Sequence, residues 1–216
     1  FDQTPLISTF HSLGLYIARL EHVDLGLKKY FSILDEKDSN SLIKEAIKDN
    51  DLDPKQFEPN RIKYIINKER NNFSDISDLE EKATTLIEQS IVKVWKQYEK
   101  KKQEMHACDF DDLLLKPVKL LTNNKEIRKK YQESWSHIHV DEYQDTNDVQ
   151  YRFIKLLMNE NNNICVVGDG DQTIYSWRGA NVKNILNFEN DYENAEVVIL
   201  EQNYRSTKNI LRAANE

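Results

Sequence analysis

The spacing of hydrophobic residues predicts helices over much of the first half of the chain. In residues 78–104 apolar side chains recur at steps of three and four, the period of an amphipathic helix: Leu79, Leu86, Ile87, Ile91, Val94, Trp95 and Tyr98. Ser77 with Glu80 three positions later fits a capping box at the start of that helix. The pair Pro54 and Pro59 marks a break before a shorter helix, which we expect over about 60–70. This part of the chain is therefore predicted to be helical.

From about residue 109 the pattern changes to short β-branched runs, at 137–140, 163–167 and 196–200. Helical patterns lie between them, the first through Val149, Phe153, Ile154, Leu157 and Met158, the second through Val182, Ile185, Leu186 and Phe188. Alternation of strands and helices is typical of a parallel sheet with crossover helices. We therefore expect an α/β fold, in which chemistry is found beyond the carboxyl ends of the strands.

Composition removes several classes of protein. The chain has five glycines, where roughly fifteen would be expected at average usage, and only four prolines, which disfavours a sandwich or barrel of many short strands. The formal net charge of -7 argues mildly against a simple basic nucleic-acid binder, although a local basic or aromatic groove stays compatible with it. No apolar run approaches the length that crosses a bilayer, so no membrane association is expected.

The two cysteines, Cys108 and Cys165, match no zinc or redox spacing. Cys165 stands inside an apolar run, and we expect it to be a small core residue. A reducing, cytoplasmic setting is the default interpretation.

Two adjacent carboxylates, Asp141 and Glu142, follow the first β-branched run. Carboxylates beside a buried strand are costly unless a cation meets them, and Mg²⁺ is a common partner that also holds substrate phosphates. The neighbouring carboxylate can then orient and activate a water molecule. The alternative is a solvated acidic turn that caps the next helix.

Gln172, Tyr175, Trp177 and Arg178 follow the second run. A glutamine at this place can hydrogen-bond a phosphate or a water molecule. Tyr175 and Trp177 alternate along the chain, so they can share one face and stack on bases, with Arg178 beside a phosphate. The alternative is an aromatic pair packed on the edge of the sheet.

Tyr204 and Arg205 follow the third run, just before a helix that Ser206 or Thr207 would cap. An arginine there can reach the γ-phosphate of a nucleotide, and a tyrosine can lie against a purine ring. The alternative for Arg205 is an ion pair with a surface carboxylate.

Taken together, these three segments resemble the motifs of superfamily 1 DNA helicases of the UvrD/Rep/PcrA type, nearest to the PcrA branch. They appear in the family's order and spacing: Asp141-Glu142-Tyr143-Gln144-Asp145-Thr146-Asn147, Val167-Gly168-Asp169-Gly170-Asp171-Gln172-Thr173-Ile174-Tyr175-Ser176-Trp177-Arg178-Gly179-Ala180 and Leu200-Glu201-Gln202-Asn203-Tyr204-Arg205-Ser206-Thr207. Two further segments agree, Thr9-Phe10-His11-Ser12 with a DNA-contacting motif and Asp109-Phe110-Asp111-Asp112-Leu113 with the segment that re-enters the motor domain.

The resemblance implies an ATP-driven, Mg²⁺-dependent motor that moves 3′ to 5′ on single-stranded DNA and unwinds duplex in repair or replication. Asp141 would hold Mg²⁺, Glu142 would activate the hydrolytic water, and Gln172 would sense the γ-phosphate. Tyr204 would stack on adenine and Arg205 would contact the γ-phosphate. The residues implied to contact DNA are Thr9, His11, Tyr175, Trp177 and Arg178.

The family fold is a RecA-like P-loop NTPase motor domain with an inserted helical subdomain. By that resemblance, residues 1–30 would begin motor domain 1A, 31–108 would form the helical subdomain 1B, and 109–216 would complete domain 1A. Single-stranded DNA, junctions of single-stranded and duplex DNA, and repair or replication proteins would be the partners.

One motif of the family is absent, because no glycine in the chain is followed by lysine and there is therefore no P-loop. We expect the chain to be a fragment that also lacks the second motor domain, to be monomeric, and to be unable to hydrolyse ATP by itself. Weak binding of single-stranded DNA through Tyr175, Trp177 and Arg178 is still expected.

Two other interpretations stay open at this point. His137, His139 and Asp141 alternate along one strand and could form the metal site of a hydrolase. Alternatively, the chain is a non-catalytic DNA- or protein-binding module derived from a helicase.

Overall fold

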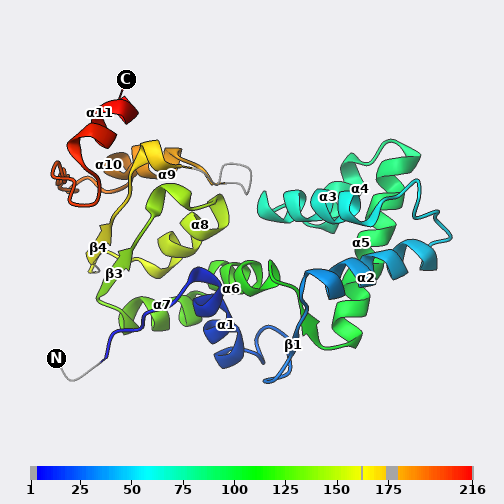
Figure 1. The fold of residues 1–216 in the computed structure, drawn as a ribbon. Coiled ribbons are helices and arrows are strands. Elements are labelled where there is room, and N and C mark those ends of the chain that lie inside the picture. Colours follow the sequence, from blue (N-terminus) through cyan, green and yellow to red (C-terminus); the bar gives the residue numbers. More distant parts are fainter. Residues whose placement is uncertain (1–3, 162, 174–179, 216) are drawn as a thin grey trace.

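The computed structural model describes residues 4–161, 163–173 and 180–215. Two groups of helices lie side by side, and Figure 1 shows α2 to α5 separated from α1, α6, α7 and α8. We call the group α2–α5 the helical lobe and the remainder the strand-containing lobe. Tyr175, Trp177 and Arg178 lie outside the described residues.

The helical lobe consists of α2 (Glu36–Asp49), α3 (Pro59–Asn71), α4 (Ile76–Lys82) and α5 (Leu86–Glu104). Its core is made of apolar side chains at helical spacing, among them Ile43, Ile47, Ile66, Val94 and Trp95, all nearly inaccessible to water. The chain enters and leaves this lobe through two short parallel strands, β1 (Ser32–Ile33) and β2 (Ala107–Cys108). Helices are therefore present where they were expected, but α5 begins at Leu86 and not near residue 78.

The helix expected from residue 78 to 104 is two helices, and the expected capping box at Ser77 and Glu80 is wrong. The observed boxes are Asp75 with Asp78, which begins α4, and Thr85 with Glu88, which begins α5. Thr85 accepts a hydrogen bond from the Glu88 amide, while the Glu88 carboxylate accepts one from the Thr85 amide. This reciprocal cap satisfies backbone groups that a continuous helix would have paired internally, so the chain breaks before it.

The strand-containing lobe begins with α1 (Phe10–Leu20) and continues with α6 (Asp112–Asn123) and α7 (Lys125–Ser134). These helices pack with α8 (Asp148–Leu157) around an apolar core that includes Leu121, Val149 and Phe153. Short 3-10 turns occupy Tyr143–Asp145 (η1) and Gly170–Gln172 (η2), and α9 (Lys183–Leu186), α10 (Phe188–Asp191) and α11 (Lys208–Asn215) complete the described elements. The single helix expected through 182–188 is thus two short ones.

The first two expected strands are confirmed. β3 (His137–Val140) and β4 (Asn163–Val166) pair in parallel, with α8 as the crossover between them, and Val140 aligns with Val166. Val140 and Ile154 meet in a small core, against which Ile164 and Val166 pack. The architecture is therefore a mixed, largely helical one with two small parallel sheets.

The third expected strand, residues 196–200, is absent from the structure, where this segment has no regular secondary structure. Its apolar side chains are exposed, from Val197 at 63% to Leu200 at 82%. The expectation that Cys165 is a core residue is also wrong, since it is exposed. Side chains on β4 alternate, so Ile164 and Val166 face the small core while Cys165 points to the opposite side of the strand.

Helices α1 and α6 approach closely at Gly14. A β-carbon added at Gly14 would overlap the carbonyl oxygen of Leu113, which lies four residues before Pro117 within α6. Proline has no N–H, so that carbonyl lacks its usual helical donor and is left facing α1. Gly14 therefore permits a backbone contact that a larger residue would prevent.

Gly14→Ala is expected to lower the free energy of unfolding by about 1–3 kcal/mol, because the added methyl group must displace backbone. In an unhindered helix the same change would stabilise by about 1 kcal/mol, so the sign is diagnostic. Urea denaturation of the chain measures the effect. Gly170→Ala is the control, because its β-carbon would meet nothing closer than 3.8 Å, and a neutral result at Gly14 would contradict the close approach.

No helix in the described part of the chain is long and apolar enough to cross a membrane.

Candidate functional site

The carboxyl end of β3 presents Asp141 and Glu142 to solvent. Glu142 has a φ of 50°, in the left-handed region that residues other than glycine seldom occupy. Its amide donates to Asp141 Oδ1 over 2.9 Å, and the next amide, that of Tyr143, donates to the Val167 carbonyl over 2.9 Å. Such strained backbone persists where the surroundings hold it, and it concentrates at functional sites.

Gln144 joins this turn to the neighbouring strand. Its side chain is only 1% exposed, its Nε2 donates to Glu142 Oε2 over 2.7 Å, and its Oε1 accepts from the Asp169 amide over 3.1 Å. Both polar atoms of this buried amide are therefore satisfied, one on the β3 side and one on the β4 side. Gln144 lies within the segment 141–147 that resembles a helicase motif, but no role for it was predicted from the sequence.

Gln172 lies beyond β4, in η2, and is exposed. Its Nε2 donates to Asp169 Oδ2 over 2.7 Å, and the other carboxylate oxygen of Asp169 accepts from the Asp171 amide over 3.0 Å. Glu142, Gln144, Asp169 and Gln172 are thus connected by consecutive hydrogen bonds. Two residues singled out from the sequence, Glu142 and Gln172, stand at the two ends of this chain of contacts.

Tyr204 and Arg205 are exposed, Tyr204 to 92%. The Asn203 carboxamide oxygen accepts hydrogen bonds from the backbone amides of Arg205 and Ser206 over 2.9 Å and 2.8 Å, which shapes the turn before α11. Among the described residues no ion pair engages the Arg205 guanidinium. Within the described ranges these two side chains are therefore free, and no hydrogen bond or ion pair joins them to Asp141 or Glu142.

Thr9 and His11 lie at the start of α1. Thr9 is the N-cap, and its hydroxyl accepts from the Ser12 amide over 3.2 Å. The His11 ring stacks on Phe110 with ring centres 3.8 Å apart and planes at 21°, and burial lowers the pKa of His11. Phe110 is itself 57% exposed, so the stacked pair presents an aromatic side chain to solvent. Sequence reasoning noted the segment around Phe110 without identifying this ring as a contact residue.

The alternative metal site finds no support in the structure. His137, His139 and Asp141 are exposed, and no group of three or more histidine, cysteine or acidic side chains in the described ranges is arranged to hold a metal ion.

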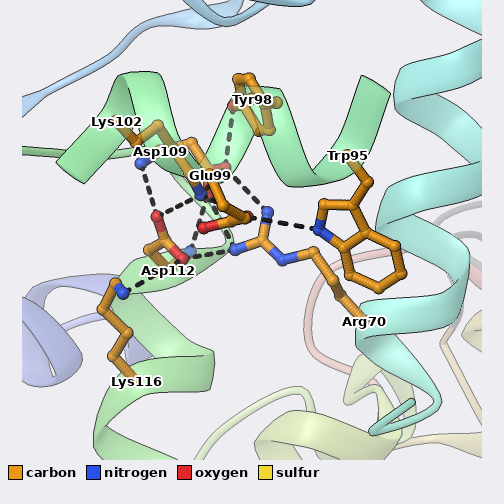
Figure 2. Close-up of polar contacts among 8 residues, drawn as sticks. All are labelled: Arg70, Trp95, Tyr98, Glu99, Lys102, Asp109, Asp112 and Lys116. Carbon is orange, nitrogen blue, oxygen red and sulfur yellow. Dashed lines mark hydrogen bonds and ion pairs between the residues drawn. The ribbon is translucent and has the colours of Figure 1, made fainter. Parts of the chain in front are cut away.

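A buried ionic cluster, which the sequence reasoning missed, lies where the two lobes meet (Figure 2). Arg70 of α3 pairs with Asp109 over 2.7 Å and with Asp112, while Lys102 of α5 contacts the same two carboxylates over 2.9 Å and 2.8 Å. All four side chains are less than 10% exposed. Burial raises the pKa of Asp109, but the charges of Arg70 and Lys102 outweigh that effect and hold it well below its usual range.

The cluster ties the helical lobe to the segment that carries Phe110. Tyr98 adds a hydrogen bond from its hydroxyl to Asp109 Oδ2 over 2.9 Å, and Asp109 and Asp112 each accept from the other's amide. Phe110 lies between these two anchored aspartates in the chain. The ring that meets His11 is therefore on a segment whose conformation is fixed from the helical lobe.

Comparison with known proteins gives consistent matches. The profile of the UvrD/REP helicase N-terminal domain family matches residues 2–193. The chain is 47% identical over 210 residues to the ATP-dependent DNA helicase PcrA of Bacillus subtilis (strain 168), a match covering 97% of the chain and 28% of that protein. It is 44% identical to PcrA of Staphylococcus epidermidis (strain ATCC 12228) and 43% identical to PcrA of Staphylococcus aureus (strain NCTC 8325), over 99% and 100% of the chain. It spans less than a third of the length of these relatives, 28–30%.

Proposed function

The chain belongs to the UvrD/REP helicase family, through that family's N-terminal domain, and we propose from this membership that it forms part of the motor of an ATP-dependent DNA helicase. The whole protein would couple ATP hydrolysis to 3′-to-5′ movement on single-stranded DNA and to duplex unwinding. The observation that carries the proposal is the juxtaposition of Glu142 and Gln172 at the ends of two parallel strands. Catalytic groups of open α/β sheets gather at such an edge.

In this proposal residues 1–30 and 109–216 are parts of one RecA-like motor domain, and residues 31–108 are a helical insertion. The helical lobe supports the division, because its core is distinct from that of the strand-containing lobe and because β1 and β2 bracket it. The insertion would face the duplex ahead of the motor, as the resemblance to the family implies.

The residues at the end of β3 fit a Mg²⁺–nucleotide complex in their donor chemistry. Mg²⁺ is commonly held by one or two carboxylates, with substrate phosphates and waters as its other ligands. Asp141 is exposed and engages one carboxylate oxygen with the Glu142 amide, so its second oxygen is available as a ligand. Bound Mg²⁺ would neutralise charge on the phosphates.

The remaining roles follow from the chemistry of each side chain. Glu142 would accept a proton from the attacking water, and Gln172 would hydrogen-bond the γ-phosphate. Arg205 would stabilise the charge that develops on the transferred phosphoryl group, and Tyr204 would stack on the adenine. Both are exposed and free of ion pairs within the described part of the chain, which leaves them able to meet a nucleotide.

Phosphate binding in such motors also requires a P-loop, and these 216 residues contain no Gly-Lys pair. We therefore propose that ATP turnover belongs to the whole protein and that the 216 residues alone do not support it. Turnover by the isolated chain that depends on Mg²⁺ and DNA and disappears in Glu142→Gln would refute this.

For DNA, we propose a binding face formed by Thr9, His11 and Phe110. The resemblance to the family adds Tyr175, Trp177 and Arg178 as further DNA-contacting residues. The aromatic surface of His11 and Phe110 suits base stacking, and the neighbouring α1 N-terminus suits a backbone phosphate. Stacking and a few local contacts would allow a chain of net charge -7 to bind DNA.

Phe110→Ala and Trp177→Ala are each expected to weaken binding of a single-stranded oligonucleotide to the chain by about 5- to 150-fold, because one stacked base contributes about 1–3 kcal/mol. Fluorescence anisotropy at low salt measures the effect. Tyr64→Ala is the matched control, since Tyr64 is an aromatic residue 66% exposed on α3, in the other lobe. Equal affinities in all variants, or no binding by the unmodified chain, would contradict the proposed DNA face.

A further inference from the structure

We propose that Gln144 is a positioning residue that, together with Asp169, transmits the state of Gln172 to the carboxylate of Glu142. The inference rests on the proposed function, in which Gln172 meets the γ-phosphate and Glu142 activates water. It adds two residues to the motor's machinery, neither of which was assigned a role from the sequence.

The geometry gives an unbroken path of three hydrogen bonds. Gln172 Nε2 donates to the Asp169 carboxylate over 2.7 Å, the Asp169 amide donates to Gln144 Oε1 over 3.1 Å, and Gln144 Nε2 donates to Glu142 Oε2 over 2.7 Å. The path crosses from the end of β4 to the end of β3.

The Gln144 amide has one usable orientation. Turning it over would place its N–H groups against the Asp169 amide and its oxygen against the Glu142 carboxylate, and both contacts would be repulsive. The side chain is also confined, because a β-carbon added at Gly168 would stand 2.5 Å from Gln144 Oε1. A buried amide that is bonded at both ends and packed closely against Gly168 holds Glu142 and Asp169 in fixed relative positions.

The ends of the path are exposed and its middle is buried, which suits a role in coupling the two ends. Gln172 and Glu142 are exposed and able to meet a substrate, whereas Gln144 between them is buried. A Gln172 amide that turns to a phosphate oxygen must leave or share Asp169 Oδ2. The same carboxylate also accepts from the Asp171 amide, so its release would let the turn at Asp169 move, together with the Asp169 amide that donates to Gln144. Gln144 then shifts with that amide, and the orientation of the Glu142 carboxylate changes with it.

The test uses Gln144→Met, which keeps the length of the side chain and removes both hydrogen bonds. In the whole protein we expect this change to lower DNA-stimulated kcat by about 10- to 100-fold through misplacement of Glu142, with KM for ATP nearly unchanged. Gln97→Met is the matched control, because Gln97 makes a comparable bond to a carboxylate, Asp49, over 2.9 Å in the helical lobe.

A double substitution separates positioning from general damage. If Gln144 acts through Glu142, the variant with both Gln144→Met and Glu142→Gln turns over ATP no more slowly than Glu142→Gln alone. A further multiplicative loss, or an equal rise in KM, would overturn the inference by showing that Gln144 acts independently of Glu142.

A second readout does not require the motor to work. In NMR spectra of the 216-residue chain, Gln144→Met should shift the Asp169 backbone amide and the Gln172 side-chain amide, while Gln97→Met leaves both in place. Unshifted signals would overturn the relay and leave the proposed function standing. Shifted signals with no ATP turnover by the unmodified whole protein would instead refute the proposed function and preserve the physical path.

Discussion

Replacing Arg70 with methionine is expected to lower the free energy of unfolding of the chain by about 3–5 kcal/mol. The guanidinium is 7% exposed and neutralises two buried carboxylates, Asp109 and Asp112. With Arg70 removed, the two carboxylates would keep Lys102, which also pairs with Glu99, and Lys116, whose Nζ lies 4.0 Å from Asp112 at the edge of the cluster. The buried negative charge would then be incompletely compensated. Urea denaturation followed by circular dichroism gives the change, and a variant that is already unfolded in buffer also agrees with it.

Two further substitutions make this expectation specific. Lys100→Met breaks an exposed pair with Glu104, at 3.9 Å and with both side chains more than 60% exposed, and should cost no more than about 1 kcal/mol. Arg70→Lys keeps the charge but loses the two-pronged geometry, so its loss should lie between the other two. If Arg70→Met costs less than about 1 kcal/mol, the cluster contributes no more than a surface pair.

Glu142→Gln in the whole protein is expected to reduce kcat for ATP hydrolysis by about 10²- to 10⁴-fold, the usual contribution of a general base. A glutamine at this position can still accept the hydrogen bond from Gln144, so the geometry is kept while the proton acceptor is lost. Steady-state turnover with saturating single-stranded DNA measures the effect, and KM for ATP should change little.

Glu160→Gln is the matched control, because Glu160 is an exposed glutamate in the loop before β4. It removes the same charge from the same lobe and should leave turnover unchanged. Nearly normal activity in Glu142→Gln would assign proton abstraction to another group and would remove the basis for the relay as well.

The sequence predicted those elements whose partners lie close along the chain. The runs at 137–140 and 163–167 became β3 and β4 because α8 returns the second strand beside the first. The run at 196–200 has the same β propensity but pairs with neither strand, and its side chains are exposed. β propensity describes fitness for a pleated, half-buried surface, and such a surface requires a neighbouring strand.

The break between α4 and α5 shows that the spacing of apolar residues alone does not predict where a helix begins. Leu86 and Ile87 continue the apolar spacing, yet they are 82% and 64% exposed in the first turn of α5. The cap formed by Thr85 and Glu88 determines the start of this helix, and it was visible in the sequence as a Thr-x-x-Glu pattern.

At the candidate site, sequence reasoning identified side chains whose chemistry is evident alone, such as Asp141, Glu142 and Gln172. It missed Gln144 because an amide acquires a role only from what it touches, and here the register of β3 against β4 decides that. The buried cluster was not predicted because Arg70 and Asp109 are far apart in sequence. From the sequence alone, charged residues of opposite sign cannot be distinguished from ordinary surface residues.

The buried cluster also decides what counts as a separable module. The helical lobe has the appearance of a separable insertion, because the pairing of β1 with β2 brings its two ends together. However, the two carboxylates of the buried cluster, Asp109 and Asp112, come after β2, outside the helical lobe. A graft of this lobe into another protein, or a deletion that joins the flanking segments directly, would separate Arg70 and Lys102 from Asp109 and Asp112. A segment intended to fold as a separate module should therefore include the first turn of α6, which contains Asp112.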